Sequence, residues 1–252
     1  ATAADGAAAL IALEQDAIGV MGQSRLGLDG YDASLPTEVL PRATSETTRI
    51  VTGISVRDLP DRWEGLAPFH TLIWSDSAEN PPQGLGADEA EALLEWVRRG
   101  GHLVINLPQA GNPWSLGGPA THRLHGILPT RAPTRVEGAP YWWLAQVLSK
   151  TSELRNLSAD TLVQVFSTAQ LDHGWQPHVV LPTTSGAGNL GMEIPPRARP
   201  MDDAMKAQLD RAVVAIQRLF GHGRVTILGI DIDATSRRQL LSTFPQPDAF
   251  WN

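Results

Sequence analysis

The amino-acid sequence predicts a single α/β domain with a doubly wound, mostly parallel sheet flanked by helices. One observation is the pattern of an amphipathic helix at residues 87–99, followed by two glycines and a short apolar run. A second is a set of three more short apolar runs upstream, each bounded by turn residues. Strands that alternate with helices of this length are typical of parallel crossover units. The composition agrees, since 42% of the residues are hydrophobic and 19% are charged, as in a globular protein.

The helix at residues 87–99 carries apolar side chains at the spacing of one buried face, which are Ala90, Leu93, Leu94 and Val97. Acidic residues occupy its first turn and arginines its last turn, which suits the helix dipole. Gly100 and Gly101 provide the left-handed stop. The apolar run at 102–107 then predicts a buried parallel strand.

The upstream apolar runs predict strands at residues 17–21, 50–54 and 71–74, and the Ala-rich stretch 5–15 could form a helix before them. The middle of the chain is different, because six prolines between residues 108 and 143 disfavour a long helix or a central strand. We therefore expect a Pro/Trp-rich excursion over about residues 111–200. Within it we expect a helix at 141–148, strands at 161–166 and 178–181, and an exposed loop at 183–200.

The stretch 201–220 allows two interpretations, a helix along its whole length or a short helix to about residue 210 followed by a β-hairpin. We favour the hairpin, which would turn at Gly221-His222-Gly223. No second hydrophobic core requires a domain boundary. We therefore treat residues 1–252 as one domain with its core at about 17–110 and 201–252.

Two groups of residues resemble a known family. The first group is Trp63-Glu64-Gly65-Leu66, Leu72-Ile73-Trp74-Ser75-Asp76 and the helix–strand unit 93–105. The second is Gly221-His222-Gly223-Arg224-Val225-Thr226-Ile227-Leu228-Gly229 with Phe250-Trp251. Over roughly residues 17–110 and 212–252 the chain resembles class I glutamine amidotransferase-like domains of uncharacterised bacterial membrane proteins. This resemblance implies a flavodoxin-like fold, a location outside the cytoplasm, and attachment to the membrane through segments outside this chain.

Active amidotransferases place a nucleophilic cysteine at a sharp turn between a strand and a helix, but this chain contains no cysteine. If that turn follows the strand at 102–107, it holds Pro108, Gln109 and Ala110, none of which is a nucleophile. The resemblance therefore implies a non-catalytic domain that binds a small molecule or another protein. Ligands of such sheets lie at the carboxyl ends of the strands. The predicted crevice residues are Gly22, Gln23, Ser75, Asp76 and Gln109.

Two other classes of function stay open. One is a hydrolase with a Ser or carboxylate nucleophile, although no G-x-S-x-G motif occurs and Ser115 lies in a loop. Asp231, Asp233 and Thr235 match the D-x-D-x-T pattern of aspartyl-phosphate phosphatases, but only 17 residues follow Thr235, so capping after a strand is the simpler interpretation. The other class is a structural assembly module, which would expose a large apolar patch.

The remaining motifs indicate no cofactor and no metal ion. His122 and His125 have the spacing of a metal-ligand pair, but no H-E-x-x-H pattern accompanies them. The glycine motif at 186–191 is followed at once by prolines instead of a helix. Tryptophans that could line a groove are Trp114, Trp142, Trp143 and Trp175, although such residues are more often core anchors. A net charge of −7 without a basic run argues against nucleic acid as a partner.

Overall fold

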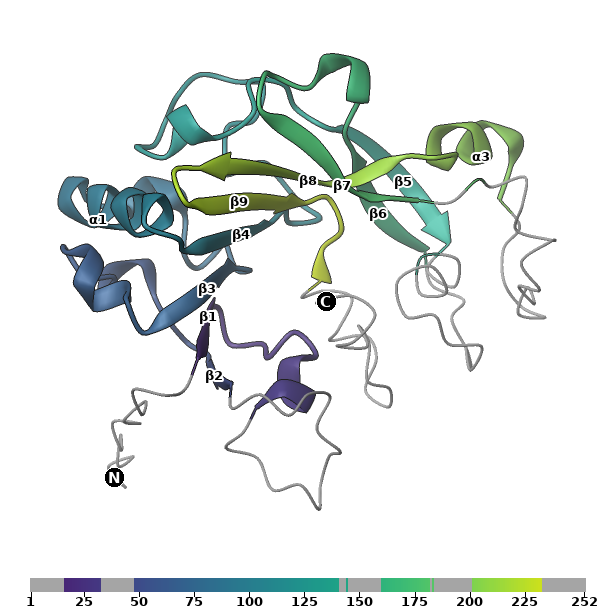
Figure 1. Ribbon diagram of the computed structural model, residues 1–252. Coiled ribbons are helices and arrows are strands. Elements are labelled where there is room, and N and C mark those ends of the chain that lie inside the picture. The colour runs from purple at the N-terminus through teal and green to yellow at the C-terminus, as the bar shows by residue number, and fades with distance from the viewer. Residues whose placement is uncertain are drawn as a thin grey trace.

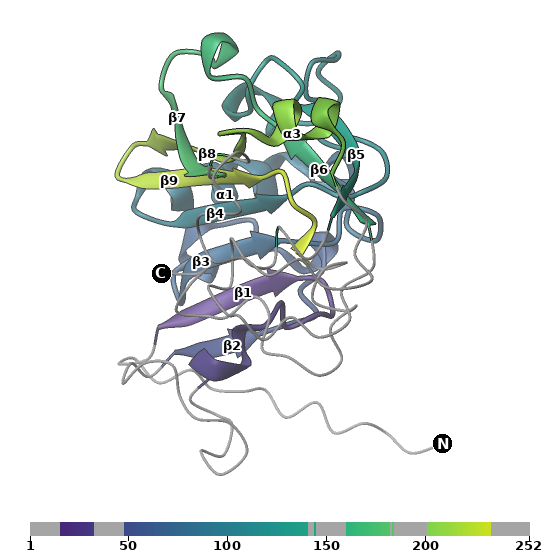
Figure 2. The same ribbon diagram turned by 90° about the vertical axis from the view of Figure 1, so that its right-hand side faces the viewer.

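A seven-stranded sheet organises the protein, and the first five strands in its order run parallel to one another (Figure 1). The computed structural model describes residues 16–32, 48–140, 144, 160–181, 183 and 201–232. The strand order is β2 (Arg49–Val51), β1 (Ala17–Met21), β3 (Phe69–Trp74), β4 (His102–Asn106), β9 (Gly223–Leu228), β8 (Val213–Phe220) and β7 (Trp175–Val180). Figure 2 shows these strands stacked with a progressive twist. The prediction of a mostly parallel α/β sheet is confirmed.

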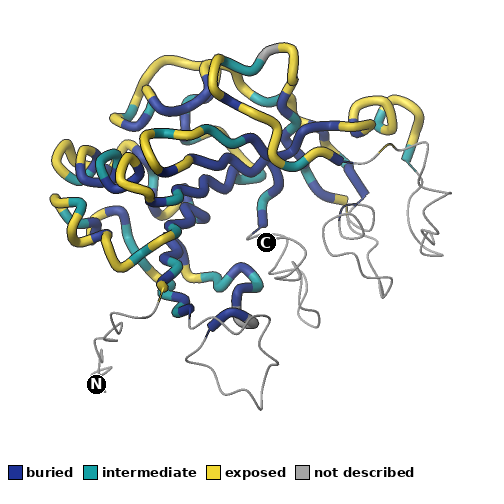
Figure 3. The backbone as a smooth tube through the Cα atoms, in the orientation of Figure 1, coloured by how far each residue is buried: buried dark blue, intermediate teal, exposed yellow. Residues whose placement is uncertain are grey.

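One face of the sheet packs against helix α1 (Ala87–Arg98) and the 3₁₀ helix η3 (Trp63–Leu66). Apolar side chains from alternate positions of the strands form this core with Leu93 and Val97, among them Leu72, Leu103 and Val225. Trp96 of α1 also donates its ring N–H to the carbonyl oxygen of Phe69, at 3.0 Å. Figure 3 shows the buried centre of the sheet and the exposed outer turns of α1.

Helix α1 ends where the sequence predicts. Gly100 has a φ of 126°, in the left-handed region that L side chains rarely adopt. Gly101 then lies so close to the ring of Trp96 that a Cβ atom there would collide with it. The two glycines thus stop the helix and let β4 begin directly under it, which is why the helix–strand unit is visible in the sequence.

The opposite face of the sheet has a different character. Its centre is apolar and packs against the 3₁₀ helix η1 (Leu28–Tyr31), with Ile73, Val104 and Leu228 in the same cluster as Leu28. Toward the amino ends of β3, β4 and β9 the side chains become polar, and this part of the face carries the hollow described below.

The C-terminal part of the core is a helix followed by a hairpin. Helix α3 (Asp203–Leu209) begins at Asp202, whose carboxylate accepts a hydrogen bond from the N–H of Met205 at 2.8 Å. Strands β8 and β9 then pair antiparallel from Ala215–Leu228 to Phe220–Gly223. The preferred interpretation of residues 201–220 is therefore confirmed, and the alternative of a helix along their whole length is wrong.

The stretch 111–200 contributes strands to two sheets. Its last described strand, β7, is the edge of the main sheet. Strands β5 (Thr134–Pro140) and β6 (Asp160–Val165) form a separate antiparallel pair. Bridges from Val163 to Ile230 and from Phe166 to Val213 join this pair to the main sheet. Short 3₁₀ helices complete the described elements: η2 (Val56–Asp58), η4 (Pro82–Gly84), η5 (His125–Ile127) and η6 (Thr168–Gln170).

Several expected elements lie outside the described residues. They are the helix at 5–15, most of the helix at 141–148, nearly all of the loop at 183–200, and the terminal Phe250-Trp251. Of the helices that the structure describes, none has both the length and the apolar character needed to cross a membrane.

Candidate functional site

The predicted crevice begins where strands β1 and β3 end side by side. Gly22 has a φ of 145°, and a Cβ atom there would lie 2.5 Å from the hydroxyl oxygen of Ser75. Ser75 is buried and donates its backbone N–H and its hydroxyl to the carbonyl oxygen of Met21, at 3.2 and 3.1 Å. Asp76 donates its N–H to the same oxygen at 3.1 Å, and its carboxylate accepts from the N–H of Glu79 at 3.1 Å. Gly22, Ser75 and Asp76 are thus brought together in close packing.

The other two predicted residues lie at different places along this edge of the sheet. Gln23 is exposed beside Gly53, whose backbone N–H bonds to the carbonyl oxygen of Gly22 at 2.7 Å. Gln109 follows β4, the next strand along, and bonds to residues after β9 and in β6. The two hollows described below are lined by other residues and include none of the five predicted crevice residues.

The turn after β4 is held by Asp231, which lies three positions after the end of β9. Asp231 accepts hydrogen bonds from the backbone N–H of Gln109 at 3.2 Å and from the side-chain amide of Asn106 at 3.3 Å. The amide oxygen of Asn106 accepts in turn from the N–H of Ile232, at 3.2 Å. Asp231 therefore ties the ends of two neighbouring parallel strands together. Its phosphatase-motif partners, Asp233 and Thr235, lie outside the described residues.

The β5–β6 pair closes the same turn from the other side. Gln109 donates its side-chain amide to the hydroxyl of Thr161, at 3.3 Å. Gln164 donates to the carbonyl oxygen of Pro108, and Arg135 to that of Gln109, both at 3.0 Å. The backbone of Pro108 and Gln109 is thus engaged with three elements around it, at the position where the amidotransferase resemblance places the nucleophile.

The loop residues Ser115 and His122 do not form a catalytic pair. Ser115 has a φ of 53°, and its hydroxyl oxygen lies 2.5 Å from that of Thr121. The Nε2 atom of His122 lies 3.1 Å from the carbonyl oxygen of Trp114, and burial is the main cause that lowers the pKa of His122. His125 lies beside it, with ring centroids 6.2 Å apart. No group of three potential metal ligands occurs among the described residues.

The tryptophans of the excursion that the structure describes are core residues. Trp114 is fully buried, donates its ring N–H to the hydroxyl of Ser77 at 3.2 Å, and packs edge-on against Trp74 at 4.7 Å. Trp175 is also buried. Both belong to the main apolar core. Trp142, Trp143 and the glycine motif at 186–191 lie outside the described residues.

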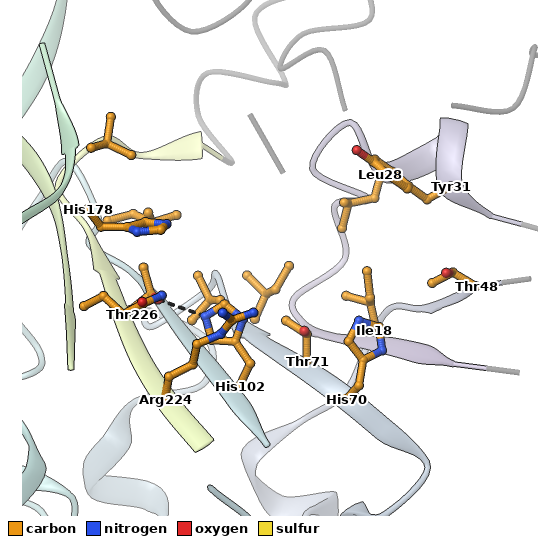
Figure 4. A pocket seen from close by; sticks show the side chains of 15 residues that line it. Ile18, Leu28, Tyr31, Thr48, His70, Thr71, His102, His178, Arg224 and Thr226 are labelled. Atoms are coloured by element: carbon orange, nitrogen blue, oxygen red, sulfur yellow. Dashed lines mark hydrogen bonds between the residues drawn. The ribbon is translucent and has the colours of Figure 1, made fainter. Parts of the chain in front are cut away.

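A hollow of about 280 Å³ lies on the face of the sheet opposite α1 (Figure 4). Its polar part carries three histidines and one arginine, which are His70, His102, His178 and Arg224. Its floor is apolar and comes from the middle of the sheet, with Ile73, Val104 and Leu228. This site is not visible in the sequence, because its residues come from six strands and form no motif along the chain.

Irregular strand pairing places two of the three histidines. The consecutive residues Ala17 and Ile18 of β1 pair with Phe69 and Thr71 of β3. His70, which lies between these two, is therefore the extra residue of a bulge. Strand β7 pairs with β8 through Pro177 and Val179 against consecutive residues, so His178 is an extra residue as well. A bulge re-aims a side chain out of the regular alternation. As a result His70 and Thr71 both line the hollow, and so do His178 and Val179.

The third histidine, His102, is held by a short chain of hydrogen bonds. Its Nε2 atom lies 2.8 Å from the hydroxyl oxygen of Thr226, which accepts from the side-chain amide of Gln217 at 3.1 Å. Burial is the largest cause that lowers the pKa of His102 to about 3, with the charge of Arg224 next. A neutral ring that accepts the Thr226 hydroxyl hydrogen at Nε2 keeps its own proton at Nδ1, which satisfies all three groups. With this low pKa, His102 is a poor general base.

A second hollow, of about 590 Å³, lies between η3 and α1 on the outer side of the molecule. Its charged lining is mostly acidic, from Asp61, Glu64, Asp88, Glu91 and Glu95. At its edge the guanidinium of Arg99 lies 4.2 Å from the ring centroid of Trp63. The two hollows therefore differ sharply in charge.

Comparison with known proteins gives only distant likenesses. No protein-family model matches the chain, and no curated protein matches its sequence. Among solved structures, the chain is similar to the cytoplasmic protein STM1381 from Salmonella typhimurium LT2, with 12% identity, a TM-score of 0.46, and coverage of 94% of this chain and 96% of that one. It is also similar to a putative ThuA-like protein from Bacteroides uniformis, with 14% identity, a TM-score of 0.37, and coverage of 90% and 88%. The likeness to an exo-β-1,4-mannosidase from an Opitutaceae bacterium has 14% identity and a TM-score of 0.38, and it covers 93% of this chain but 33% of that enzyme.

Proposed function

We propose that this chain is a non-catalytic binding module with a flavodoxin-like, amidotransferase-like fold, which binds a small molecule or a protein for a larger membrane-anchored protein outside the cytoplasm. The observation that carries the non-catalytic part is the closed turn after β4. Pro108 and Gln109 occupy it, and Asp231, Gln164 and Arg135 bond to its backbone. The location and the membrane attachment rest on the sequence resemblance alone.

The strand order supports the flavodoxin-like part of the proposal. Numbered along the chain, the five parallel strands β1, β2, β3, β4 and β9 lie in the order second, first, third, fourth, fifth. This is the order of flavodoxin-like doubly wound sheets. Strands β8 and β7 extend the sheet antiparallel beyond it.

The surroundings of Asp231 argue against its use as a nucleophile. A carboxylate nucleophile works with a neighbouring general acid or base, whereas a carboxylate that ties two strand ends together has a structural role. Both oxygens of Asp231 instead accept hydrogen bonds, one from Asn106 and one from Gln109. The hydroxyl of Ser115 bonds with that of Thr121, and among the described residues no histidine is hydrogen-bonded to it.

A structural assembly role finds less support. Such a module would expose a contiguous apolar surface of several hundred Å². The exposed large apolar side chains among the described residues are Val180 and Leu219, with 51% and 74% of their surfaces accessible. Single exposed residues of this kind are ordinary on a soluble surface.

Hydrolysis assays test the non-catalytic proposal. The full chain would be incubated with glutamine and, separately, with p-nitrophenyl acetate, and ammonia or nitrophenol release would be compared with that of D231N and S115A. We expect all three proteins to match the protein-free blank, and a fluorophosphonate probe to leave the mass of the chain unchanged. A wild-type rate above the blank that D231N or S115A abolishes would instead establish a hydrolase.

A further inference from the structure

We propose that the hollow on the sheet face opposite α1 binds a small organic anion, with Arg224 as the partner of the anionic group. This inference rests on the proposed binding role and names its ligand class. It moves the site from the carboxyl ends of the strands, where the sequence places it, to the sheet face near their amino ends. The hollow is close in size to the smallest ligand pockets, which start at roughly 300 Å³, and measures about 280 Å³.

The charge of the hollow favours an anion. Arg224 supplies a positive charge to the lining, and no carboxylate is among the described residues that line the hollow. The chain as a whole has a net charge of −7, so a hollow that contains an arginine and no acidic residue differs in charge from the protein as a whole. The acidic hollow beside α1 shows the contrast, since it is lined by five carboxylates and one arginine. An anion is thus attracted to one hollow and repelled from the other.

The histidines supply neutral donors around the arginine. Burial is the largest cause that lowers the pKa of both His102 and His178, and the charge of Arg224 contributes to both effects. His102 and Arg224 are also paired residues of the neighbouring strands β4 and β9, and Figure 4 shows both side chains at the hollow. The neutral rings of His102 and His178 donate an N–H without adding charge, so an anionic group would meet its charged partner in Arg224 and neutral donors beside it.

The two bulges indicate that this arrangement is built into the fold. In a regular strand, His70 and Thr71 would point to opposite faces, as would His178 and Val179. The extra residue in β3 and the extra residue in β7 bring both histidines to the same hollow from opposite sides of His102. Bulges of this kind are enriched beside binding and catalytic sites.

The apolar floor determines the rest of the ligand. Ile73, Val104 and Leu228 line the hollow from the middle of the sheet. Leu28 of η1 borders it as well (Figure 4). Thr71 and Gln217 contribute polar groups to the lining. A ligand that fits both parts has an anionic head and a compact apolar body. A carboxylate and a phosphate ester share this chemistry.

Titration of the full chain with matched probes tests the proposal. Benzoate and phenyl phosphate carry the anionic head on the same apolar ring, and benzyl alcohol is their neutral counterpart. We expect saturable binding of at least one anion by calorimetry, with chemical-shift changes in the histidine-ring NMR spectrum, and no saturable binding of the alcohol. The preferred anion then distinguishes a carboxylate from a phosphate ligand.

Substitution of the arginine locates the site. R224Q should weaken anion binding by about tenfold or more, because it removes a charge-assisted hydrogen bond. R224K should keep most of the affinity, and R57Q, on an exposed residue outside the hollow, should not change it. H178Q provides a second variant, at the histidine that the β7 bulge brings to the hollow, and should weaken binding less than R224Q.

Several results would overturn this site. They are the absence of saturable binding of both anions, equal binding of benzyl alcohol, or equal affinity in R224Q and R57Q. Each of these leaves the hydrolysis assays unaffected, so the site can fail while the non-catalytic proposal stands. Conversely, hydrolysis that depends on Asp231 would remove the non-catalytic proposal without touching the anion titrations.

Discussion

The backbone N–H of Gln109 donates to the carboxylate of Asp231 at 3.2 Å, across 122 positions of the sequence. This bond joins the turn after β4 to the end of the neighbouring strand region, and Asn106 reinforces it from the same turn. It explains why the edge of the sheet where a nucleophile is expected from the family resemblance is closed.

The first prediction concerns this bond. D231A should lower the free energy of unfolding by about 2 kcal/mol, because hydrogen bonds to a charged group contribute roughly 1.5–3 kcal/mol and two donors lose their acceptor. D231N should cost less, since its amide oxygen can still accept one bond. Urea unfolding measures the difference, with D61N on an exposed residue as the control. If D231A unfolds at the same urea concentration as D61N, the carboxylate does not hold the turn.

The second prediction concerns pH and His102. Its pKa is lowered from 6.5 to about 3 by burial and then by Arg224, with smaller effects of His178 and His70. The unfolded chain therefore takes up a proton between pH 6.5 and 3 that the native protein refuses. Stability from this residue is complete above pH 6.5 and falls with decreasing pH, by at most about 1.4 kcal/mol per pH unit.

H102Q tests this pH dependence, because glutamine retains hydrogen-bonding groups but does not titrate. Urea unfolding of the wild type and of H102Q should diverge in slope between pH 6 and 4, in the sense that the wild type loses stability faster as the pH falls. Parallel pH profiles for the two proteins would show that His102 titrates alike in the folded and unfolded chains.

The parts of the fold that the sequence predicts are those fixed by local patterns. Helix α1 follows from the spacing of Leu93 and Val97 and from the glycines after it, and β4 follows from its apolar run. The β8–β9 hairpin was visible because Gly221 allows the turn, where its φ is 67°. Each of these signals lies within a dozen residues.

The candidate site was not predictable in the same way. His70 and His178 enter the hollow through bulges, and a bulge depends on how a strand pairs with its neighbour. His102 begins the predicted strand at 102–107, and its partner Thr226 lies 124 positions away. The positions of these residues in the sequence do not reveal how the strands pair, and it is the pairing that brings them together.

The third prediction concerns the tryptophan of the excursion. W114A should lower the free energy of unfolding by roughly 3–5 kcal/mol, the usual cost of removing a large aromatic side chain from a core. Trp114 packs against Trp74 and bonds to Ser77, so the loss combines packing with a hydrogen bond. L219A, at a side chain that is 74% exposed, is the matched control and should change stability by less than about 0.5 kcal/mol. A tryptophan that served only to line an open groove would behave like the control in this unfolding measurement.

The fourth prediction tests how tightly the ends of β1 and β3 are packed. G22A should destabilise the protein by roughly 1–3 kcal/mol, because alanine is strained at a φ of 145° and its Cβ would lie 2.5 Å from the hydroxyl oxygen of Ser75. The control is G126A, where a Cβ meets nothing within 4 Å. Thermal or urea unfolding of G22A, S75A and the double variant separates the two causes.

The double variant has a defined expected outcome. S75A removes the oxygen that collides with the new Cβ but leaves the backbone of residue 22 in its strained region, so G22A should cost less in the S75A background than in the wild type, without becoming neutral. If the cost of G22A is the same in both backgrounds, backbone strain alone accounts for it. If G22A costs nothing in the wild type, the strand ends have room to separate, and a ligand crevice at Gly22 and Ser75 regains support over the closed packing described above.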